Sequence, residues 1–335
     1  MNLLNGRTMM VVVIAVLVVA ASMRLGWWGA RRAWPEATGW NRIPGELRPA
    51  EAARGEGEPW IRWLGHSGFV IYWHGQTLLV DPNLSGRCTV ARRTMELPPP
   101  LAGIGPATVL ISHAHYDHLN IDTLAGIEQL ESILIPAGSE VFLERFSGGR
   151  DVILPVEKDT TYTAGALRIT PVRAAHNGNR FHPLRSTFAA VGYMISGPDG
   201  KTIYVAGDTA FANDWQDLRE RFHPDLAILP IGAYAPRIPL KYHHLNPEEA
   251  ARVAELLGAG EVIPCHFGTF TLSFDRPSSA LPRFAAAAKA LNLNWTMPVL
   301  LDQRGITDLV TMTRQGRRPA ADLSSTRMPT EDAVP

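Results

Sequence analysis

Three histidines and an aspartate lie within six positions of one short stretch: His113, His115, Asp117 and His118. The stretch, LISHAHYDHLN, continues an apolar run. Packed imidazoles repel one another once protonated, and four titratable side chains are costly to bury unless something binds them. Imidazole and carboxylate together are ligands that suit Zn²⁺, Mn²⁺ or iron. The residue types and their spacing therefore predict a metal site.

Three further polar residues come directly after β-type runs. His176 ends LRITPVRAAH, Asp208 ends TIYVAGD and His266 ends EVIPCH. Strand ends and the loops that follow them are where α/β folds place sites. Taken alone, each of these residues would be interpreted as a cap or a turn residue. Their recurrence after three separate runs favours additional ligands, which two metal ions would need.

The elements that must position these residues are short strands and a few helices. A meander of three strands is predicted from Trp60, followed by a buried strand at 107–113. The later predicted strands are 132–136, 166–176, 186–196, 201–208, 225–232 and 261–266. The predicted helices are 121–131, 138–146, 246–258 and 279–291. The order is β-rich, then β/α, and then the same again, which predicts two sheets face to face with helices outside.

Composition limits the classes of function. The chain has 335 residues, of which 46% are hydrophobic and 19% charged, so it is far too apolar for a disordered protein. Lys+Arg 32 balances Asp+Glu 32, which gives no electrostatic footprint for nucleic acid. With 2 cysteines, Cys88 and Cys265, a disulfide framework is excluded. Stability must come from the core or from metal.

Residues 8–23 carry no charge and would span about 24 Å as a helix, which predicts a short single-span membrane anchor. A cleaved signal peptide is the alternative. The arginines that follow this run favour weakly a cytoplasmic C-terminal domain. The expected organisation is an anchor or signal at 1–28, a linker at 29–58, a folded domain at 59–313 and a flexible tail at 314–335.

The stretch HAHYDH matches the HxHxDH signature of the metallo-β-lactamase superfamily, whose fold is an αββα sandwich with a binuclear metal site. Longer blocks resemble one branch, N-acyl-phosphatidylethanolamine phospholipase D and its bacterial relatives. These blocks are WLGHSG, LLVDPNLS, LISHAHYDHLNIDTL, YVAGDTAF, LPIGAYAPRIPLKYHHLNPEEA and IPCHFGTF. They extend from about Trp60 to Asp302. The resemblance implies an α/β fold with two mixed β-sheets face to face and helices outside.

The resemblance also implies roles for individual residues and two divalent metal ions, with Zn²⁺ expected. One metal would be held by His113, His115 and His176. The other would be held by Asp117, His118 and His266, and Asp208 would bridge the two. His244 matches an active-site histidine outside the metal ligands. The expected catalytic residues are accordingly Asp117, Asp208 and His244.

Several other assignments are less direct. Asp81 and His66 are expected to orient ligands without binding metal, with turn roles as the alternative. Tyr234, Arg237, Phe188 and Phe267 are expected at the substrate, where arginine suits a phosphate and the aromatic rings an acyl chain. A structural salt bridge and simple core packing are the alternatives. Two positions depart from the branch: Asn177 and Phe267 stand where tryptophan is expected.

The function implied is hydrolysis of a phosphodiester, D-type cleavage of (N-acyl-)phosphatidylethanolamine to phosphatidic acid and an ethanolamide. A lactone or other small-ester hydrolase on the same fold is one alternative, and a non-catalytic membrane-bound metal-binding protein is another. The expected partners are a phospholipid substrate and a membrane, reached through residues 8–23, without nucleic acid; a homodimer is left open. The expected location is the bacterial inner membrane, in a single-pass topology of undetermined side.

Overall fold

The computed structural model describes most of residues 59–305. The described residues are 59–98, 101, 104–144, 146, 148–149, 151–181, 188–276, 278–298 and 303–305. Of two compact units, Met1–Leu47 and Arg48–Pro335, the second contains them all. The expected anchor at 1–28, the linker at 29–58 and the tail at 314–335 lie outside the described residues.

The first sheet has seven strands in the order β15-β1-β2-β3-β6-β7-β8. Their bounds are β1 Trp60–Gly65, β2 Gly68–Trp73, β3 Gln76–Val80, β6 Ala107–Leu110, β7 Leu130–Pro136, β8 Ile153–Val156 and β15 Gln303–Gly305. The strands β15 to β3 pair antiparallel, as the predicted meander requires, while β3, β6, β7 and β8 pair parallel. The carboxyl end of β6 leads directly into the HAHYDH stretch.

The second sheet has six strands in the order β14-β13-β12-β11-β10-β9. Their bounds are β9 Tyr162–Ala164, β10 Leu167–Arg173, β11 Val191–Ser196, β12 Thr202–Val205, β13 Leu226–Pro230 and β14 Glu261–Cys265. The strands β9 to β12 pair antiparallel, and β12, β13 and β14 pair parallel. A separate pair, β4 Arg87–Cys88 and β5 Ala91–Arg92, lies outside both sheets. Both large sheets are thus mixed, as expected.

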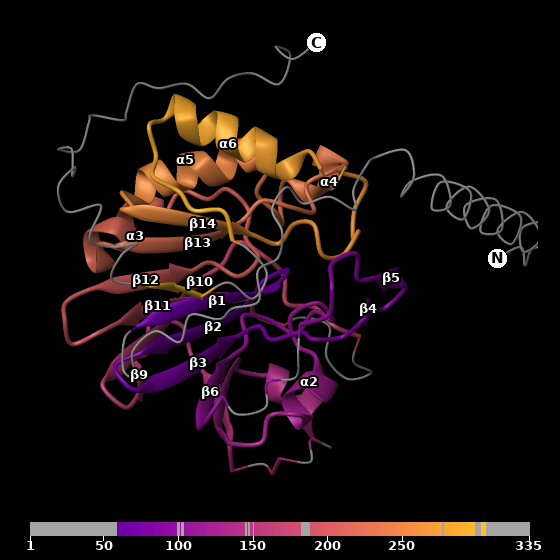
Figure 1. Cartoon of the computed structure of the whole chain (residues 1–335), viewed down its shortest axis with the longest axis vertical. Helices are drawn as coiled ribbons and strands as arrows, with labels where there is room; N and C mark the ends of the chain where they lie inside the picture. The colour runs from indigo at the N-terminus through magenta and orange to yellow at the C-terminus, as the bar shows by residue number, and fades with distance from the viewer. Residues whose placement is uncertain are drawn as a thin grey trace, which may run out of the picture. The chain divides into compact units, whose positions relative to one another are not determined.

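The two sheets stack face to face, with helices on their outer faces (Figure 1). The helices are α2 Ile121–Ala125, α3 Trp215–Phe222, α4 Arg237–Leu240, α5 Pro247–Leu257 and α6 Ala280–Ala290, with a 3₁₀ helix, η1, at Ser139–Leu143. α3, α5 and α6 pack over the second sheet through a cluster that includes Trp215, Val253 and Phe284. α2 covers the first sheet through Leu124. The αββα fold class expected from the sequence is confirmed.

The layer between the sheets is apolar, with Phe69, Leu78 and Ile195 among its buried side chains. Polar bonds join the two sheets at the end that carries the ligands. The Tyr193 hydroxyl of β11 donates to the Ile111 carbonyl at 2.7 Å. The Val191 amide donates to the Ser112 carbonyl at 2.9 Å. The segment after β6 is therefore held against the second sheet just before His113.

The best-signalled helix has the boundaries that its sequence indicates. The Asn246 side chain accepts from the Glu249 amide and Glu249 accepts from the Asn246 amide, which makes a capping box at the start of α5. Gly258 ends the helix with φ 63, in the left-handed region that glycine favours. Two other helix predictions were too long. α2 stops at Ala125 because Gly126 follows, and the predicted helix at 138–146 is only the 3₁₀ turn η1.

The membrane expectation needs correction. In the part of the chain that the structure describes, no helix has the length and apolar character to span a membrane. The 8–23 segment, on which the expected transmembrane helix and single-pass inner-membrane location rested, lies outside the described residues. That location is accordingly withdrawn.

Candidate metal centre

The predicted ligands converge from several strand ends onto one site. His113, His115, Asp117 and His118 follow β6 of the first sheet. His176, Asp208 and His266 follow β10, β12 and β14 of the second. Because β12 and β14 belong to the parallel part of their sheet, their carboxyl ends lie at the same edge. The stacking of the sheets then brings this edge against the segment after β6.

One group of four donors comprises His113, His115, His176 and Asp208. His115 Nδ1 lies 2.9 Å from His113 Nε2 and 3.2 Å from His176 Nε2. Asp208 Oδ2 lies 3.9 Å from His113 Nε2 and 4.0 Å from His176 Nε2. A tetrahedral Zn²⁺ with Zn–N of about 2.1 Å would place its ligand atoms about 3.4 Å apart. The group has the dimensions of one metal site.

A second group shares Asp208 with the first. Asp208 Oδ2 lies 3.3 Å from His118 Nε2 and 3.2 Å from His266 Nε2. Asp117 Oδ2 lies 3.6 Å and 3.4 Å from the same two nitrogen atoms. These four separations again match the edges of a tetrahedral site. The same Asp208 oxygen faces both groups, which is the position of a bridging ligand.

Unpartnered polar atoms at the centre support metal binding. His118 Nε2, both ring nitrogens of His266 and Asp208 Oδ1 are buried without a hydrogen-bond partner. Buried polar groups in proteins are nearly always paired, and unpaired ones call for an unseen ion or water. Their position between two sets of donors fits metal ions. The residues present therefore form clusters able to bind metals.

Hydrogen bonds outside the centre orient the imidazole rings toward it. Asp81 Oδ2 lies 2.7 Å from His118 Nδ1 and accepts from the Ser112 hydroxyl at 2.6 Å. Ser112 Oγ lies 2.9 Å from His113 Nδ1, and the His243 carbonyl lies 2.8 Å from His176 Nδ1. Each of these partners places the proton on Nδ1 and leaves the Nε2 lone pair free for a metal. These contacts place Asp81 where its expected orienting role requires, and the role itself stays a prediction.

The electrostatics of the centre favour ionised carboxylates. Burial would raise the pKa of Asp208, but His266 and His118 outweigh it and hold that pKa well below its ordinary value. The same balance, with His118 as the main counteracting group, lowers the pKa of Asp117. Burial lowers the pKa of His176 to about 3, which leaves its ring neutral at pH 7. Burial would lower the pKa of His118 and His266, but Asp208 outweighs it and raises both, that of His266 to about 9. Ionised carboxylates and neutral imidazoles are the forms that bind metal, so a metal ion must displace the protons of these two rings.

His244 lies beside both groups. Its Nδ1 is 3.7 Å from Asp208 Oδ2, is buried and has no hydrogen-bond partner. Its ring centre is 5.0 Å from that of His176 and 5.6 Å from that of His266. Burial lowers the pKa of His244 to about 4, so the ring is neutral at pH 7. It offers the site an N–H donor and a lone pair, but no positive charge.

The expected substrate residues have partners within the protein. Arg237 donates to the His244 carbonyl at 2.9 Å and pairs with the Glu249 carboxylate. The Tyr234 hydroxyl lies 2.6 Å from Ser279 Oγ. Phe267 stacks on Trp63, and Phe188 packs against Phe142. The structural alternatives raised for these side chains, a salt bridge for Arg237 and packing for the aromatics, match these contacts. Substrate contact by any of the four stays a prediction.

The sequence reasoning missed three groups that contact the centre or its loop. Ser112 links Asp81 to His113, and its signal was its place directly before the HAHYDH stretch. The His243 carbonyl, which accepts from His176, is a backbone group and carries no signal in the sequence. Arg180 was also missed: it stacks over the Tyr116 ring at 3.9 Å and donates to the Leu119 carbonyl at 3.0 Å. It clamps the metal-binding loop.

Comparison with known proteins agrees with this geometry. Residues 76–267 match the model of the β-lactamase superfamily domain. A metal-dependent hydrolase of Methanopyrus kandleri is 32% identical over 63% of this chain and 84% of its own length. A protein of Mycobacterium tuberculosis is 32% identical over 71% of this chain. The match covers 66% of the length of that relative.

Solved structures show the same fold. The metallo hydrolase Igni18 of Ignicoccus hospitalis superposes with a TM-score of 0.55 at 21% identity, over 74% of this chain and 99% of its own. The family match, these relatives and the two clusters of histidine and aspartate lead to one conclusion. The chain belongs to the metallo-β-lactamase superfamily and, with the Methanopyrus kandleri relative, to its UPF0173 family of metal-dependent hydrolases.

Proposed function

We propose that this hydrolase cleaves a phosphodiester, and that its substrate is a phospholipid of the (N-acyl-)phosphatidylethanolamine type. Cleavage on the headgroup side of phosphorus would release phosphatidic acid and an ethanolamide. The observation that carries the proposal is the shared Asp208 oxygen, 3.2 to 4.0 Å from ligand atoms of both metal groups. Such an arrangement suits in-line displacement at an anionic ester, where two centres hold the attacking and leaving oxygens.

The metals would supply Lewis-acid activation of a water molecule and of a phosphoryl oxygen. The protein residues have the remaining tasks. Asp208 and Asp117, both ionised, offset the positive charge of the centre. Asp81 and Ser112 keep the rings of His118 and His113 turned inward. The burial of these groups limits the access of bulk water to the reacting ester.

His244 is assigned to the leaving group. Its neutral ring lies next to Asp208, and an N–H of this ring would donate to the oxygen that carries the departing headgroup. Arg237 fixes the backbone at this histidine by donating to its carbonyl. Glu249 holds Arg237 and also caps α5, so the orientation of His244 depends on the start of that helix.

A neighbouring cavity offers space for part of the substrate. It has a volume of about 470 Å³ and is lined by Ala175, Ala210, Phe211, Lys241 and Tyr242, among others. These residues belong to three segments that also carry His176, Asp208 and His244. Apolar and aromatic side chains suit an acyl chain, and the Lys241 ammonium suits an anionic group.

One observation favours a second candidate, a lactone or other small uncharged ester. Arg237, the cation expected at a phosphate, is neutralised by Glu249. With Arg237 paired, the metals would carry most of the task of neutralising a phosphodiester, and they would polarise the carbonyl of an uncharged ester as well.

The test is a substrate panel for the Zn²⁺-loaded protein. N-acyl-phosphatidylethanolamine and phosphatidylethanolamine in mixed micelles are compared with a nitrophenyl phosphodiester and with a series of lactones. The proposal expects the highest kcat/KM on a phospholipid, with phosphatidic acid as product and little turnover by His244→Asn. Diacylglycerol as product, or a lactone that exceeds every phospholipid in kcat/KM, would contradict it.

A further inference from the structure

His66 occupies a fixed position between the two sheets. It lies in the β1–β2 turn with φ 54, a left-handed conformation, and its side chain is buried. Its amide donates to Thr269 Oγ1 at 2.6 Å. Its carbonyl accepts from the His266 amide at 3.0 Å and from Trp63 Nε1 at 2.9 Å. Three hydrogen bonds to the backbone of His66 thus hold the residue in place, and with it the point from which its ring extends.

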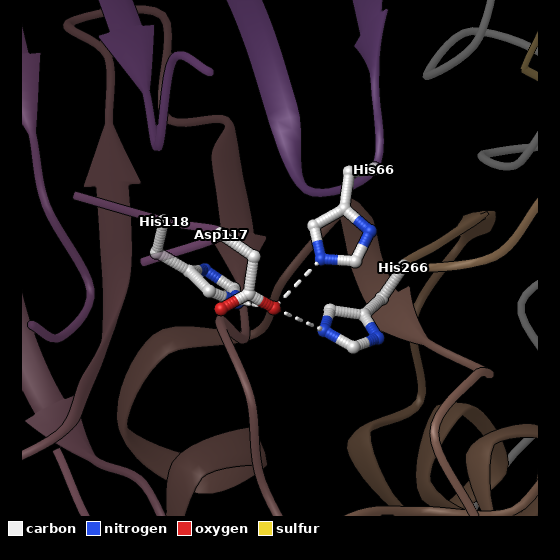
Figure 2. Close-up of side chains that lie close together, drawn as sticks. All are labelled: His66, Asp117, His118 and His266. Carbon is white, nitrogen blue, oxygen red and sulfur yellow. Dashed lines mark hydrogen bonds and ion pairs between the residues drawn. The ribbon is translucent and has the colours of Figure 1, made fainter. Parts of the chain in front are cut away.

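The ring points at the second metal group, as Figure 2 shows. His66 Nε2 lies 2.9 Å from Asp117 Oδ2, the carboxylate oxygen that faces His118 and His266. The ring centre is 4.0 Å from that of His266 and 5.3 Å from that of Phe270. His66 therefore contacts two of the ligands of this group, Asp117 and His266.

The hydrogen-bond pattern identifies which nitrogen carries the proton. Nδ1 of His66 is buried and has no hydrogen-bond partner. A buried N–H without an acceptor is rarer in proteins than an acceptor without a donor. A proton on Nε2 avoids that situation and pairs with the ionised Asp117 in a charge-assisted hydrogen bond. In this form His66 donates to Asp117, and its Nε2 is not available as a metal ligand.

We propose that His66 is a positioning residue of the Asp117–His118–His266 metal site, acting on Asp117 and His266 while Asp81 contacts His118. Its N–H holds the Asp117 carboxylate in the ligating orientation, while its carbonyl holds the backbone of His266. Two of the three ligands that belong to this site alone are thus fixed by one residue. The ligands of the other site are oriented elsewhere, His113 through Ser112 and His176 through the His243 carbonyl. Loss of the His66 donor should therefore affect one metal and spare the other. The inference rests on the metal centre and not on the identity of the substrate.

The experiment compares two variants of the full chain. His66→Gln keeps an N–H donor at about the same reach, and His66→Phe keeps a ring without a donor. Both place a non-glycine side chain at the same positive φ, so backbone strain is matched. His223→Gln serves as the control, since His223 also has a positive φ, 46, and caps the C-terminal end of α3. Metal content by elemental analysis, Zn²⁺ affinity by chelator competition and the visible spectrum of the Co²⁺ form are measured, with circular dichroism as the check on folding.

The expected result is a loss of affinity for the second metal by 10–100-fold in His66→Phe, with the first metal retained and the fold intact. His66→Gln should keep both metals with an affinity near that of the parent chain. Equal affinities in His66→Phe and the parent would overturn the inference, as would equal loss of both metals or unfolding of both variants. If His66→Gln loses the second metal as fully as His66→Phe and the Co²⁺ spectrum changes its ligand number, His66 is a ligand and the positioning role is wrong. A failure of the phospholipid proposal would leave all these readouts unchanged.

Discussion

Replacing Asp81 by asparagine tests how the protein prepares a ligand before metal arrives. Asp81 is 1% exposed and accepts three hydrogen bonds, from His118 Nδ1, the Ser112 hydroxyl and the Ser112 amide, at 2.6 to 2.7 Å. The asparagine oxygen can keep the bond to the Ser112 amide. Its NH₂ group then faces His118 and the Ser112 hydroxyl, where an acceptor is needed.

The magnitude follows from the two bonds that change. Hydrogen bonds to a buried charged group contribute about 1.5–3 kcal/mol each, and the new amide donor recovers part of this at Ser112, so a net loss of about 3 kcal/mol is expected. For a domain of this size that loss lowers the Tm by about 6–12 °C. Backbone strain does not contribute, because Asp81 has φ 39 and asparagine accepts this conformation readily. The His118 ring also loses the partner that keeps its proton on Nδ1, so Zn²⁺ affinity should fall by about 10–100-fold.

The assay has two parts, each with Ser112→Ala as the matched control. Thermal unfolding is followed for the metal-free and Zn²⁺-loaded forms, and Zn²⁺ affinity is measured by chelator competition. Ser112→Ala should cost about 1.5–3 kcal/mol, because the lost hydroxyl donates to the charged Asp81 carboxylate, while the bond between Asp81 and His118 stays in place. The Tm difference for Asp81→Asn should be larger in the Zn²⁺-loaded form than in the metal-free form. A Zn²⁺ affinity within twofold of the parent chain would refute the orienting role of Asp81.

Three other variants test separate parts of the structure. His244→Ala should keep both metals and lose most of kcat, since this histidine is assigned to the leaving group; loss of metal on elemental analysis would make it a ligand. Tyr193→Phe removes the 2.7 Å hydrogen bond to the Ile111 carbonyl that joins the sheets, and should lower the free energy of unfolding in denaturant titration by about 1–2 kcal/mol; an unchanged value would mean that water replaces the hydroxyl. Burial raises the pKa of Glu261, so the folded protein favours the protonated side chain. The stability that this protonated side chain contributes is complete below the pKa of Glu261 in the unfolded chain, and it is lost as pH rises through the pKa in the folded protein. Glu261→Gln should therefore raise the Tm more at pH 8 than at pH 4, and the opposite order would contradict that sign.

The parts of the fold that could be predicted from the sequence are those whose residues carry a local signal. Asn246, Pro247 and Gly258 determine the ends of α5 through backbone conformation and capping alone, so the sequence sufficed there. α3 was not predicted, because only Trp215 and Leu218 of its eight residues are buried and its apolar period is short. The end of α2 was misplaced because the pattern after Gly126 still looked helical. The cost of Gly126 in a helix interior outweighed that pattern at α2, and tertiary packing, which the pattern does not contain, decided the case of α3.

The candidate site divides in the same way. His176, Asp208 and His266 were expected as ligands because each follows a strand, and the structure brings all three to the HAHYDH stretch. The pairing of Arg237 with Glu249 needs the turn between α4 and α5 that brings the two side chains together. The donor role of His66 likewise depends on Thr269 and His266, which lie about two hundred residues away in the chain. Partners this distant leave no spacing that a single sequence reveals.

The central claim is that two metal ions share Asp208. Elemental analysis of the purified, active chain, alongside Asp208→Asn, tests it most directly. The account predicts two metal equivalents per chain, and a loss of metal together with activity in the variant. A fully active chain that holds one metal or none, or an Asp208→Asn variant that keeps both metals and its activity, would contradict the binuclear centre.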